Sequence, residues 1–308
     1  MSSPPFLPRG KVVVVTGGAG GIGAALCLAF ATGGASAVVV ADLDLEGAER
    51  VCEECRRAAS SSSSSSLLAL ARRVDVTVDS EVEALIGWSE RRAGPIDLFA
   101  ANAGVMAARS GVEMGGAGRG RAKGAFAPPE EWDRVLAVNL GHLVSVGRHL
   151  VPRYLARGGG HLVITASAAA ICPVGAASYA VSKAAALAFG EWLAIAYGSR
   201  GVGVCCVCPQ RTRTDMTRGY GGNQDRWLGR MIEPGEVAEC CLEALRGGNV
   251  HAFPHGEVRS HFRRKAADTD RWVRGMRRVN DMYLRAVREH GDQEDGAREQ
   301  SAPFLSRL

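Results

Sequence analysis

The glycine-rich segment at residues 16–23, TGGAGGIG, constrains the fold more than any other part of this chain. It follows a run typical of a buried strand, residues 11–15, and opens a helix-like stretch at residues 24–32. Glycines at such a turn let the backbone approach a pyrophosphate, whose oxygens the free N–H groups at the helix start then bind. We therefore predict a dinucleotide site here, with an ordinary tight turn as the alternative. The residues expected to contact the cofactor are Gly17, Gly21, Ile22 and Gly23.

Short apolar or β-branched runs alternate with helix-length segments along most of the chain. We predict strands at residues 11–15, 37–41, 73–75, 97–101, 161–165, 203–207 and 250–253. We predict helices at residues 24–32, 80–92, 131–155 and 179–198. Several of the strands are apolar throughout, which is typical of strands buried on both faces. The alternation predicts an α/β fold, a doubly wound parallel sheet with helices on both faces.

The chain is expected to form one main domain, residues 11–253, after an N-terminal tail at residues 1–10. A serine tract near residues 60–66 and a glycine-rich stretch near 107–127 interrupt the pattern and are predicted to be flexible insertions. Residues 254–308 form a helical extension and tail rich in arginine. Near-helical spacing of apolar side chains there predicts an amphipathic helix packed on the main domain. These side chains are Trp272, Met276, Val279 and Leu284.

Asp42 ends the second predicted strand and indicates which dinucleotide binds. A carboxylate at this place accepts hydrogen bonds from both ribose hydroxyls of adenosine and repels a 2′-phosphate. Neither residues 18–20 nor the positions directly after Asp42 include a Lys or Arg that could receive such a phosphate. We therefore expect NAD rather than NADP; the alternative is that Asp42 is an ordinary solvated residue beside Asp44.

Tyr179 and Lys183 lie four residues apart, so on a helix their side chains project from one face. A phenol has a pKa of about 10 and is a poor base at neutral pH. A neighbouring ammonium stabilises the phenolate, lowers that pKa and allows proton exchange with an alcohol. Ser167, at the end of a predicted strand, carries a hydroxyl that can hold a substrate oxygen beside Tyr179. The alternative is a surface tyrosine near a surface lysine.

Five motifs together resemble the short-chain dehydrogenase/reductase family. They are residues 16–23, Ala101-Asn102-Ala103-Gly104, Asn139, Ser167 and Tyr179-Ala180-Val181-Ser182-Lys183. The resemblance covers about residues 11–253 and implies a Rossmann-type domain with a seven-stranded sheet, dimeric or tetrameric through two long helices. It also implies an NAD-dependent oxidoreductase that interconverts a secondary alcohol and its ketone, with hydride passing between the substrate carbon and the nicotinamide.

The resemblance implies a role for each matching residue. Tyr179 corresponds to the general acid/base, and Ser167 to the residue that orients the substrate oxygen. Lys183 corresponds to the lysine that also binds the nicotinamide ribose, and Asn139 to the residue that supports a proton-relay water. Further cofactor contacts are implied at Asp75, Val76, Asn102, Ala103 and Gly104. For Asn102, Asp75 and Val76, sheet-end capping and core packing are the alternatives.

The segment after the sixth predicted strand departs from the family pattern. That pattern has Pro-Gly or Pro-Gln-Gly, then an aliphatic residue, then a threonine two positions later. Here Arg211 replaces the glycine and Thr212 the aliphatic residue, which bears on the shape of the loop and on substrate access. Thr214 can still meet the nicotinamide carboxamide, and the backbone at Thr212 can still bind it.

Apolar side chains near these motifs are expected to line the substrate pocket, with core packing as the alternative. They are Ile171, Val174, Met216, Trp227 and Met231. A mainly apolar pocket favours a lipid-like or ring-containing alcohol or ketone.

Composition excludes several classes of protein. A chain of 308 residues with 46% hydrophobic and 22% charged content can bury a sizeable core, which excludes a wholly disordered chain. Its apolar runs are too short for the roughly 18 residues of a membrane-spanning helix. Nine cysteines, an odd number, together with a start that has no apolar signal segment, indicate a reducing compartment. The CxxC at Cys52 and Cys55 has no second pair, so no metal site is expected.

The formal net charge of +5 is too small to indicate nucleic-acid binding without a clustered patch. The arginine-rich C-terminal helix is the candidate patch, so the alternative function is a nucleotide-fold scaffold or nucleic-acid-binding protein that uses it. Asp268, Asp270 and Asp281 interrupt the basic run, which favours a solvated helix face. We therefore expect no nucleic-acid partner.

The last three residues, Ser306-Arg307-Leu308, resemble the S-K-L signal for peroxisomal import. In a eukaryotic cell this predicts a peroxisomal enzyme, with a chance tripeptide on a cytosolic enzyme as the alternative. In a bacterium the tripeptide carries no address, and a cytoplasmic enzyme is expected.

Overall fold

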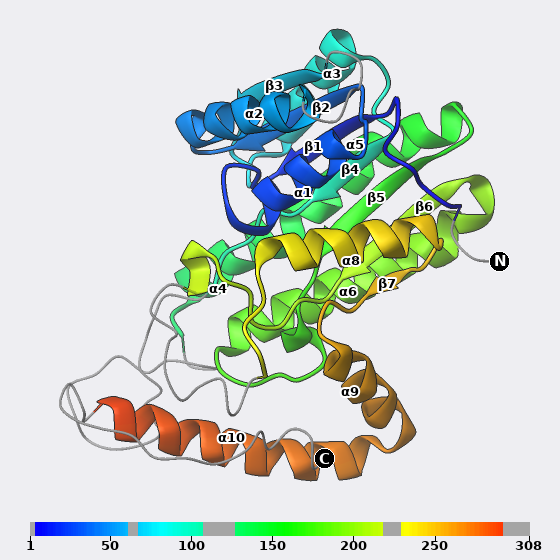
Figure 1. Ribbon diagram of the computed structural model, residues 1–308. Helices are drawn as coiled ribbons and strands as arrows, with labels where there is room; N and C mark the ends of the chain where they lie inside the picture. The colour runs from blue at the N-terminus through cyan, green and yellow to red at the C-terminus, as the bar shows by residue number, and fades with distance from the viewer. Residues whose placement is uncertain (1–3, 61–66, 107–126, 218–228, 292–308) are drawn as a thin grey trace.

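The computed structural model describes residues 4–60, 67–106, 127–217 and 229–291, with side chains described as far as residue 282. Seven strands form one parallel sheet in the order β3-β2-β1-β4-β5-β6-β7 (Figure 1). They are β1 (Val12–Thr16), β2 (Ala37–Asp42), β3 (Leu68–Arg73), β4 (Leu98–Ala101), β5 (Gly160–Thr165), β6 (Val202–Val207) and β7 (His251–Ala252). The predicted doubly wound parallel sheet is confirmed.

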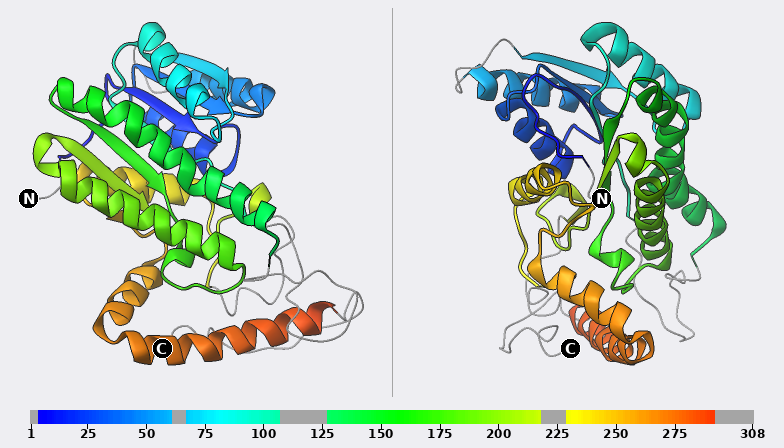
Figure 2. Two further views of the ribbon diagram at one scale, coloured as in Figure 1. Left: turned by 180° about the vertical axis from the view of Figure 1, so that it is seen from behind. Right: turned by 90° about the vertical axis from the view of Figure 1, so that its right-hand side faces the viewer.

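Helices cover both faces of the sheet, as the side view in Figure 2 shows. One face is covered by α1 (Gly21–Thr32), α2 (Leu45–Ser60) and α8 (Pro234–Arg246). The other is covered by α3 (Asp79–Ala93), α5 (His142–Ala156) and α6 (Ala177–Tyr197). The glycine-rich turn and the loops after β4, β5 and β6 all leave the carboxyl edge of the sheet, where ligands of such sheets bind.

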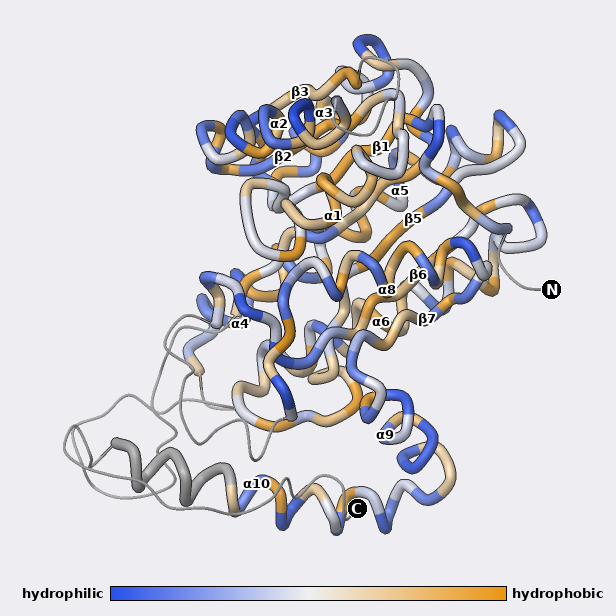
Figure 3. The backbone as a smooth tube through the Cα atoms, viewed as in Figure 1, coloured by the Kyte–Doolittle hydropathy of each residue, from blue (hydrophilic) through white to orange (hydrophobic). Residues whose placement is uncertain are grey.

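The central strands are apolar on both sides because each side faces a helical layer. Val14 and Val39 belong to the core beneath α3, α5 and α6, whereas Val13 and Val38 belong to the core beneath α1, α2 and α8. All four are fully buried. In Figure 3 the central strand β5 is coloured as hydrophobic along most of its length, whereas α9, which lies off the sheet, is largely hydrophilic. The continuous valine runs in the sequence thus reflect burial on both faces.

The predicted strand at residues 73–75 is wrong in position. The strand is β3, Leu68–Arg73, which pairs with β2 and ends where the prediction begins. It lies at the edge of the sheet, and its residues are mostly half-buried or exposed. An edge strand needs no β-branched apolar run, so its Leu-Ala-Leu-Ala sequence carried little strand signal. The other predicted strands agree with the structure to within two residues.

The predicted helix at residues 131–155 is interrupted. α4 (Pro129–Leu136) passes into a π-helical turn, Ala137–Gly141, and then into α5. Such turns insert an extra residue into a helix and occur often at functional sites. This one contains Asn139, whose side chain it directs into the protein, where Asn139 is 2% exposed.

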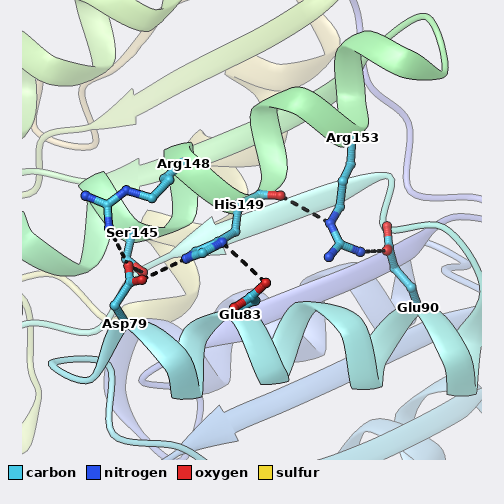
Figure 4. A network of polar contacts seen from close by, with 7 residues as sticks. All are labelled: Asp79, Glu83, Glu90, Ser145, Arg148, His149 and Arg153. Atoms are coloured by element: carbon cyan, nitrogen blue, oxygen red, sulfur yellow. Dashed lines mark hydrogen bonds and ion pairs between the residues drawn. The ribbon is translucent and has the colours of Figure 1, made fainter.

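A network of polar contacts holds α3 against α5 (Figure 4). The Asp79 carboxylate accepts hydrogen bonds from Ser145 Oγ at 2.6 Å and Arg148 Nη1 at 3.1 Å, and its Oδ2 lies 3.0 Å from His149 Nε2. The bond from Ser145, then that from His149, lowers the pKa of Asp79. Farther along, Arg153 pairs with Glu90. The network fixes the start of α3, which follows Asp75 and Val76, relative to the helix that follows Asn139.

Beyond β7 the chain leaves the sheet and forms two helices, α9 (Gly256–Ala267) and α10 (Thr269–Gly291), which we call the arm (Figure 1). Trp272, Met276 and Val279 are buried on one face of α10, as the spacing predicted. The side chain of Leu284 lies outside the described part, as do most of the two predicted insertions and the C-terminal tail. At the other end, Phe6 packs on Phe30 and is 2% exposed.

Candidate active site

The glycine-rich turn needs its glycines for two physical reasons. Gly17 and Gly21 adopt positive φ angles of 64° and 54°, which disfavour any other residue. A Cβ atom on Gly23 would lie 1.9 Å from the carbonyl oxygen of Gly17, so α1 could not pack this closely on the turn. A Cβ on Gly21 would lie 2.9 Å from Thr214 Cγ2. The turn and the loop after β6 therefore meet at the carboxyl edge of the sheet.

Asn102 holds this turn in place. Its Nδ2 donates to the carbonyl oxygens of Thr16 and Gly17, both at 3.1 Å, and its Oδ1 accepts from Thr165 Oγ1 at 2.9 Å. The side chain thus joins β1, β4 and β5 at their carboxyl ends, the capping role that the sequence left open. Ala103 lies directly against the turn, because its Cα would be 2.8 Å from a Cβ on Gly17.

Asp42 is placed beside the glycine-rich turn. Its Oδ2 accepts from the backbone N–H of Ala19 at 3.0 Å, and its Oδ1 accepts from the N–H of Asp44 at 3.1 Å. The carboxylate is half-buried, so it remains within reach of a ligand in the turn. Asp44 has a different task, since it accepts from the N–H of Gly47 in the first turn of α2.

Asp75 and Val76 lie where the chain passes from β3 to α3. The Asp75 carboxylate accepts from the hydroxyl and the N–H of Thr77 at 2.7 and 2.9 Å, and these bonds lower its pKa. Val76 is 8% exposed and belongs to the core beneath α5 and α6. Asp75 thus stabilises the turn before α3, and Val76 packs in the core, the two alternatives to a cofactor contact that the sequence left open.

Lys183 is the buried cation of the site. It is 4% exposed, its Nζ donates to the carbonyl oxygen of Thr165 at 2.8 Å, and burial lowers its pKa to about 8. The Nζ also lies 5.9 Å from the centre of the Tyr179 ring. Both side chains come from one face of α6, as their spacing predicted. Ser167 follows β5, is 7% exposed, and accepts from the N–H of Ala169 at 3.1 Å.

Asn139 reaches the same place from the π-helical turn. Its Oδ1 accepts from the N–H of Val105 at 2.8 Å, while its Nδ2 lies within hydrogen-bond distance of Val105 O at 2.9 Å and Ser182 Oγ at 3.0 Å. A Cβ on Gly104 would be 3.1 Å from Lys183 Nζ and 3.3 Å from Asn139 Oδ1. The chain after β4 therefore passes close to both side chains, and a side chain at residue 104 would press against them.

Two residues of the site were not foreseen. Ser182, to which the sequence assigned no role, joins α6 to Asn139 and donates to the carbonyl oxygen of Tyr179 at 2.8 Å. His142, fully buried one turn after Asn139, places its Nε2 3.2 Å from Thr16 Oγ1. Burial and, second, the charge of Lys183 lower the His142 pKa to about 3, so it is neutral at physiological pH. Its helical spacing from Asn139 was the only sequence signal.

The loop after β6 is fixed by its own threonines. Thr217 Oγ1 donates to the carbonyl oxygen of Thr212 at 2.6 Å and accepts from the N–H of Thr214 at 3.0 Å. Arg211 is buried, at 6% exposed, and its guanidinium lies 3.5 Å from the carbonyl oxygen of Gly229. Thr212 is buried too and forms a β-bridge with Ile232.

The five residues expected to line the pocket differ in their surroundings, and one of them, Met231, is half-buried. Ile171 is 1% exposed and belongs to the main core, so packing explains it. Val174 packs on α10, while Met216 is exposed. Trp227 lies outside the described residues. Among the residues that the structure does describe, no group of three or more His, Cys, Asp or Glu is placed to bind a metal, and no helix is long and apolar enough to cross a membrane.

Comparisons with known proteins agree on one family. Residues 11–225 match the family model described as short chain dehydrogenase. The chain is 33% identical over 265 residues to 1-deoxy-11-beta-hydroxypentalenate dehydrogenase of Streptomyces exfoliatus, covering 85% of this chain and 90% of that protein. It is 30% identical to cis-4-hydroxycyclohexanecarboxylate dehydrogenase of Sinomonas cyclohexanicum, covering 80% and 93%.

Solved structures with the same fold hold nicotinamide nucleotides. A 7 alpha-hydroxysteroid dehydrogenase complexed with NADH and 7-oxo glycochenodeoxycholic acid is similar with a TM-score of 0.67 and 25% identity, over 80% of this chain and 94% of that one. A short chain dehydrogenase/reductase from Burkholderia phymatum, in complex with NAD, has the same fold, with a TM-score of 0.71 and 23% identity over 86% and 96% of the two chains.

Proposed function

The chain belongs to the short-chain dehydrogenase family, and from this premise we propose that it interconverts a secondary alcohol and its ketone with NAD(H). The observation that carries the proposal is the convergence of Tyr179, Lys183 and Asn139 beside the glycine-rich turn. These residues come from two helices that meet through Ser182, and the backbone at Gly104 lies close to both Lys183 and Asn139. The comparisons lend no support to the alternative of a scaffold or nucleic-acid-binding protein.

The proposed proton transfer depends on Tyr179 and Lys183. We assign Tyr179 the exchange of the alcohol proton and Ser167 the orientation of the substrate oxygen. The Lys183 ammonium, held in the protein interior by Thr165, stabilises the phenolate form of Tyr179 because charges interact strongly where water is excluded. Asn139 holds the backbone at Val105 and so keeps the loop beside Lys183 in position.

The turn supports a dinucleotide site, because Gly17, Gly21 and Gly23 let its backbone close tightly against Ala103, Thr214 and the start of α1, and the free N–H groups at such a helix start bind a pyrophosphate. We propose that Ile22, Thr212 and Thr214 and the segment Asn102-Ala103-Gly104 complete the cofactor site, with Asp75 and Val76 at the adenine end. When bound, the nicotinamide supplies or accepts the hydride. Asp42 beside the turn supports NAD over NADP, because its charge would repel a 2′-phosphate.

For the substrate we propose an apolar, ring-containing alcohol. The names of two relatives, a hydroxycyclohexanecarboxylate dehydrogenase and a hydroxysteroid dehydrogenase, support this class. The test is a panel of secondary alcohols, from 2-butanol to cyclohexanol and a hydroxysteroid, with NAD and with NADP, followed by the absorbance of the reduced cofactor. Failure of every alcohol with both cofactors, in a protein that binds NADH, would overturn the proposal.

Tyr179→Phe tests the proposed acid/base directly. Loss of the hydroxyl removes only proton transfer, so turnover should fall by about 10²–10⁴-fold while the Kd for NADH stays within a few-fold of wild type. Steady-state kinetics and NADH fluorescence give the two measurements. Turnover within a few-fold of wild type would mean that another group exchanges the proton.

We also propose a homodimer or homotetramer formed through α5 and α6. Large apolar side chains are exposed on these helices, including Val144 at 37%, Trp192 at 53% and Ile195 at 83%. Exposed apolar groups on adjoining long helices favour association with a second copy.

Peroxisomal import is a further proposal that depends on Ser306-Arg307-Leu308 being the free end of the chain in a eukaryotic cell. A fluorescent protein fused at the N-terminus should collect in peroxisomes, and the same fusion lacking the tripeptide should not. A diffuse signal from both would discard the proposal.

A further inference from the structure

The arm contacts the part of the chain that links the two proposed oxygen-binding groups. The chain leaves the site at Ser167 and returns to it at Tyr179, so we expect the residues between them to pass beside a substrate whose oxygen these two side chains hold. The first of these residues are fixed by the main domain: Ala168 donates to the carbonyl oxygen of Pro209 at 2.8 Å, and Ile171 is buried in the main core. Residues 172–176 follow, and α10 packs on two of them, Cys172 and Val174.

The contact is an apolar cluster separate from the two cores that flank the sheet. Trp272, Met276 and Val279, spaced by four and three residues on α10, are 6–8% exposed and pack on Cys172 and Val174. Cys172 also touches the main core, whereas Val174 touches the arm cluster. The position of Val174 therefore depends on the arm rather than on the sheet.

Trp272 is the central side chain of this contact. Its ring lies 5.6 Å from the ring of His261 on α9, so it joins the two helices of the arm as well as the arm and the main domain. Among the described residues, neither Trp272 Nε1 nor the two ring nitrogens of His261 have a hydrogen-bond partner. The contact between Trp272 and its neighbours therefore depends on apolar packing rather than on hydrogen bonds of these two rings, and truncating Trp272 should loosen it.

We propose that Trp272 is a positioning residue that sets the shape of the substrate-binding region by holding residues 172–176 against the main domain. The proposal rests on the proposed function, and it deepens it: the arm would select for the size of the group attached to the reacting carbon. If residues 172–176 are held rigidly, a substrate whose ring fills the space beside them should bind better than a small acyclic alcohol. If these residues are mobile, the preference for the cyclic alcohol should be lost.

The first test does not depend on activity. Hydrogen exchange of the full chain is compared for wild type, Trp272→Ala, Trp272→Phe and Val273→Ala, the last being an exposed neighbour on α10. The amides of Cys172 and Val174, which donate to the carbonyl oxygens of Ala168 and Cys172 at 2.8 Å, should exchange at least about tenfold faster in Trp272→Ala alone. Amides of β5 should not change. Unchanged exchange at residues 172–176 in Trp272→Ala would overturn the proposal.

The second test measures selectivity. The ratio of kcat/KM for cyclohexanol to kcat/KM for 2-butanol should fall at least about fivefold in Trp272→Ala, with the Kd for NADH within twofold of wild type, and Trp272→Phe should restore most of it. An equal fall for both alcohols, or an unchanged ratio, would overturn the selectivity role. A wild-type protein that binds NADH but oxidises no alcohol of the panel with either cofactor would refute the proposed function instead, and the exchange result would then decide whether Trp272 positions residues 172–176.

Discussion

Burying the Lys183 ammonium should cost folding stability, and the cost should depend on pH. Its pKa falls from an ordinary 10.5 to about 8, chiefly because the side chain is removed from water. Each tenfold change in acidity corresponds to about 1.4 kcal/mol, so the protonated side chain destabilises the fold by about 3 kcal/mol at pH 7. Such a cost is typical of residues kept for function rather than stability.

The direction of the pH dependence follows from proton binding. Between pH 8 and 10.5 the unfolded chain holds the Lys183 proton while the folded chain has released it. The unfolded state therefore binds more protons, and this group makes the fold more stable as the pH rises. Its full cost is present below pH 8 and disappears above pH 10.5.

The assay is denaturant unfolding of wild type and Lys183→Met at pH 7 and at pH 10. Groups far from residue 183 respond to pH alike in both proteins, so their contributions cancel in the difference. The free energy of unfolding of wild type should rise relative to that of the variant by about 2–3 kcal/mol between the two pH values. Parallel curves, or a relative fall, would refute the assignment of a costly buried charge to Lys183.

Two further predictions concern the cofactor and the assembly. Asp42→Ser should narrow the preference for NAD over NADP by about tenfold, since like charges about 4 Å apart repel by about 1–4 kcal/mol. The control is Asp42→Asn, which removes the charge but keeps an oxygen that can accept the hydrogen bond from the Ala19 N–H. A wild-type enzyme with a higher kcat/KM for NADPH than for NADH would contradict the assignment. The double variant Trp192→Arg, Ile195→Arg should be monomeric in analytical ultracentrifugation, whereas the control Val273→Arg on the arm should keep the oligomeric state of wild type. A monomeric wild-type protein would contradict the proposed interface.

The sequence alone predicted those features whose cause is local. The glycines of residues 16–23 are required by a turn within the segment itself, and the valine runs of β1 and β2 record burial on both faces. Tyr179 and Lys183 fall on one face of α6 because helical geometry relates residues four apart. Such patterns depend on neighbouring residues in the chain, so they can be recognised without knowing which distant residues they contact.

Only the tertiary structure decided how the site is held together, because its contacts join segments far apart in the sequence. His142 meets Thr16 across the sheet edge, and Asn139 meets Ser182 between two helices. No local pattern distinguishes these side chains from other buried polar residues. The same reason explains the misplaced edge strand β3, which forms by pairing with β2 rather than by its own propensity. It also applies to the arm, because the sequence predicted its apolar face but not that this face packs on Cys172 and Val174.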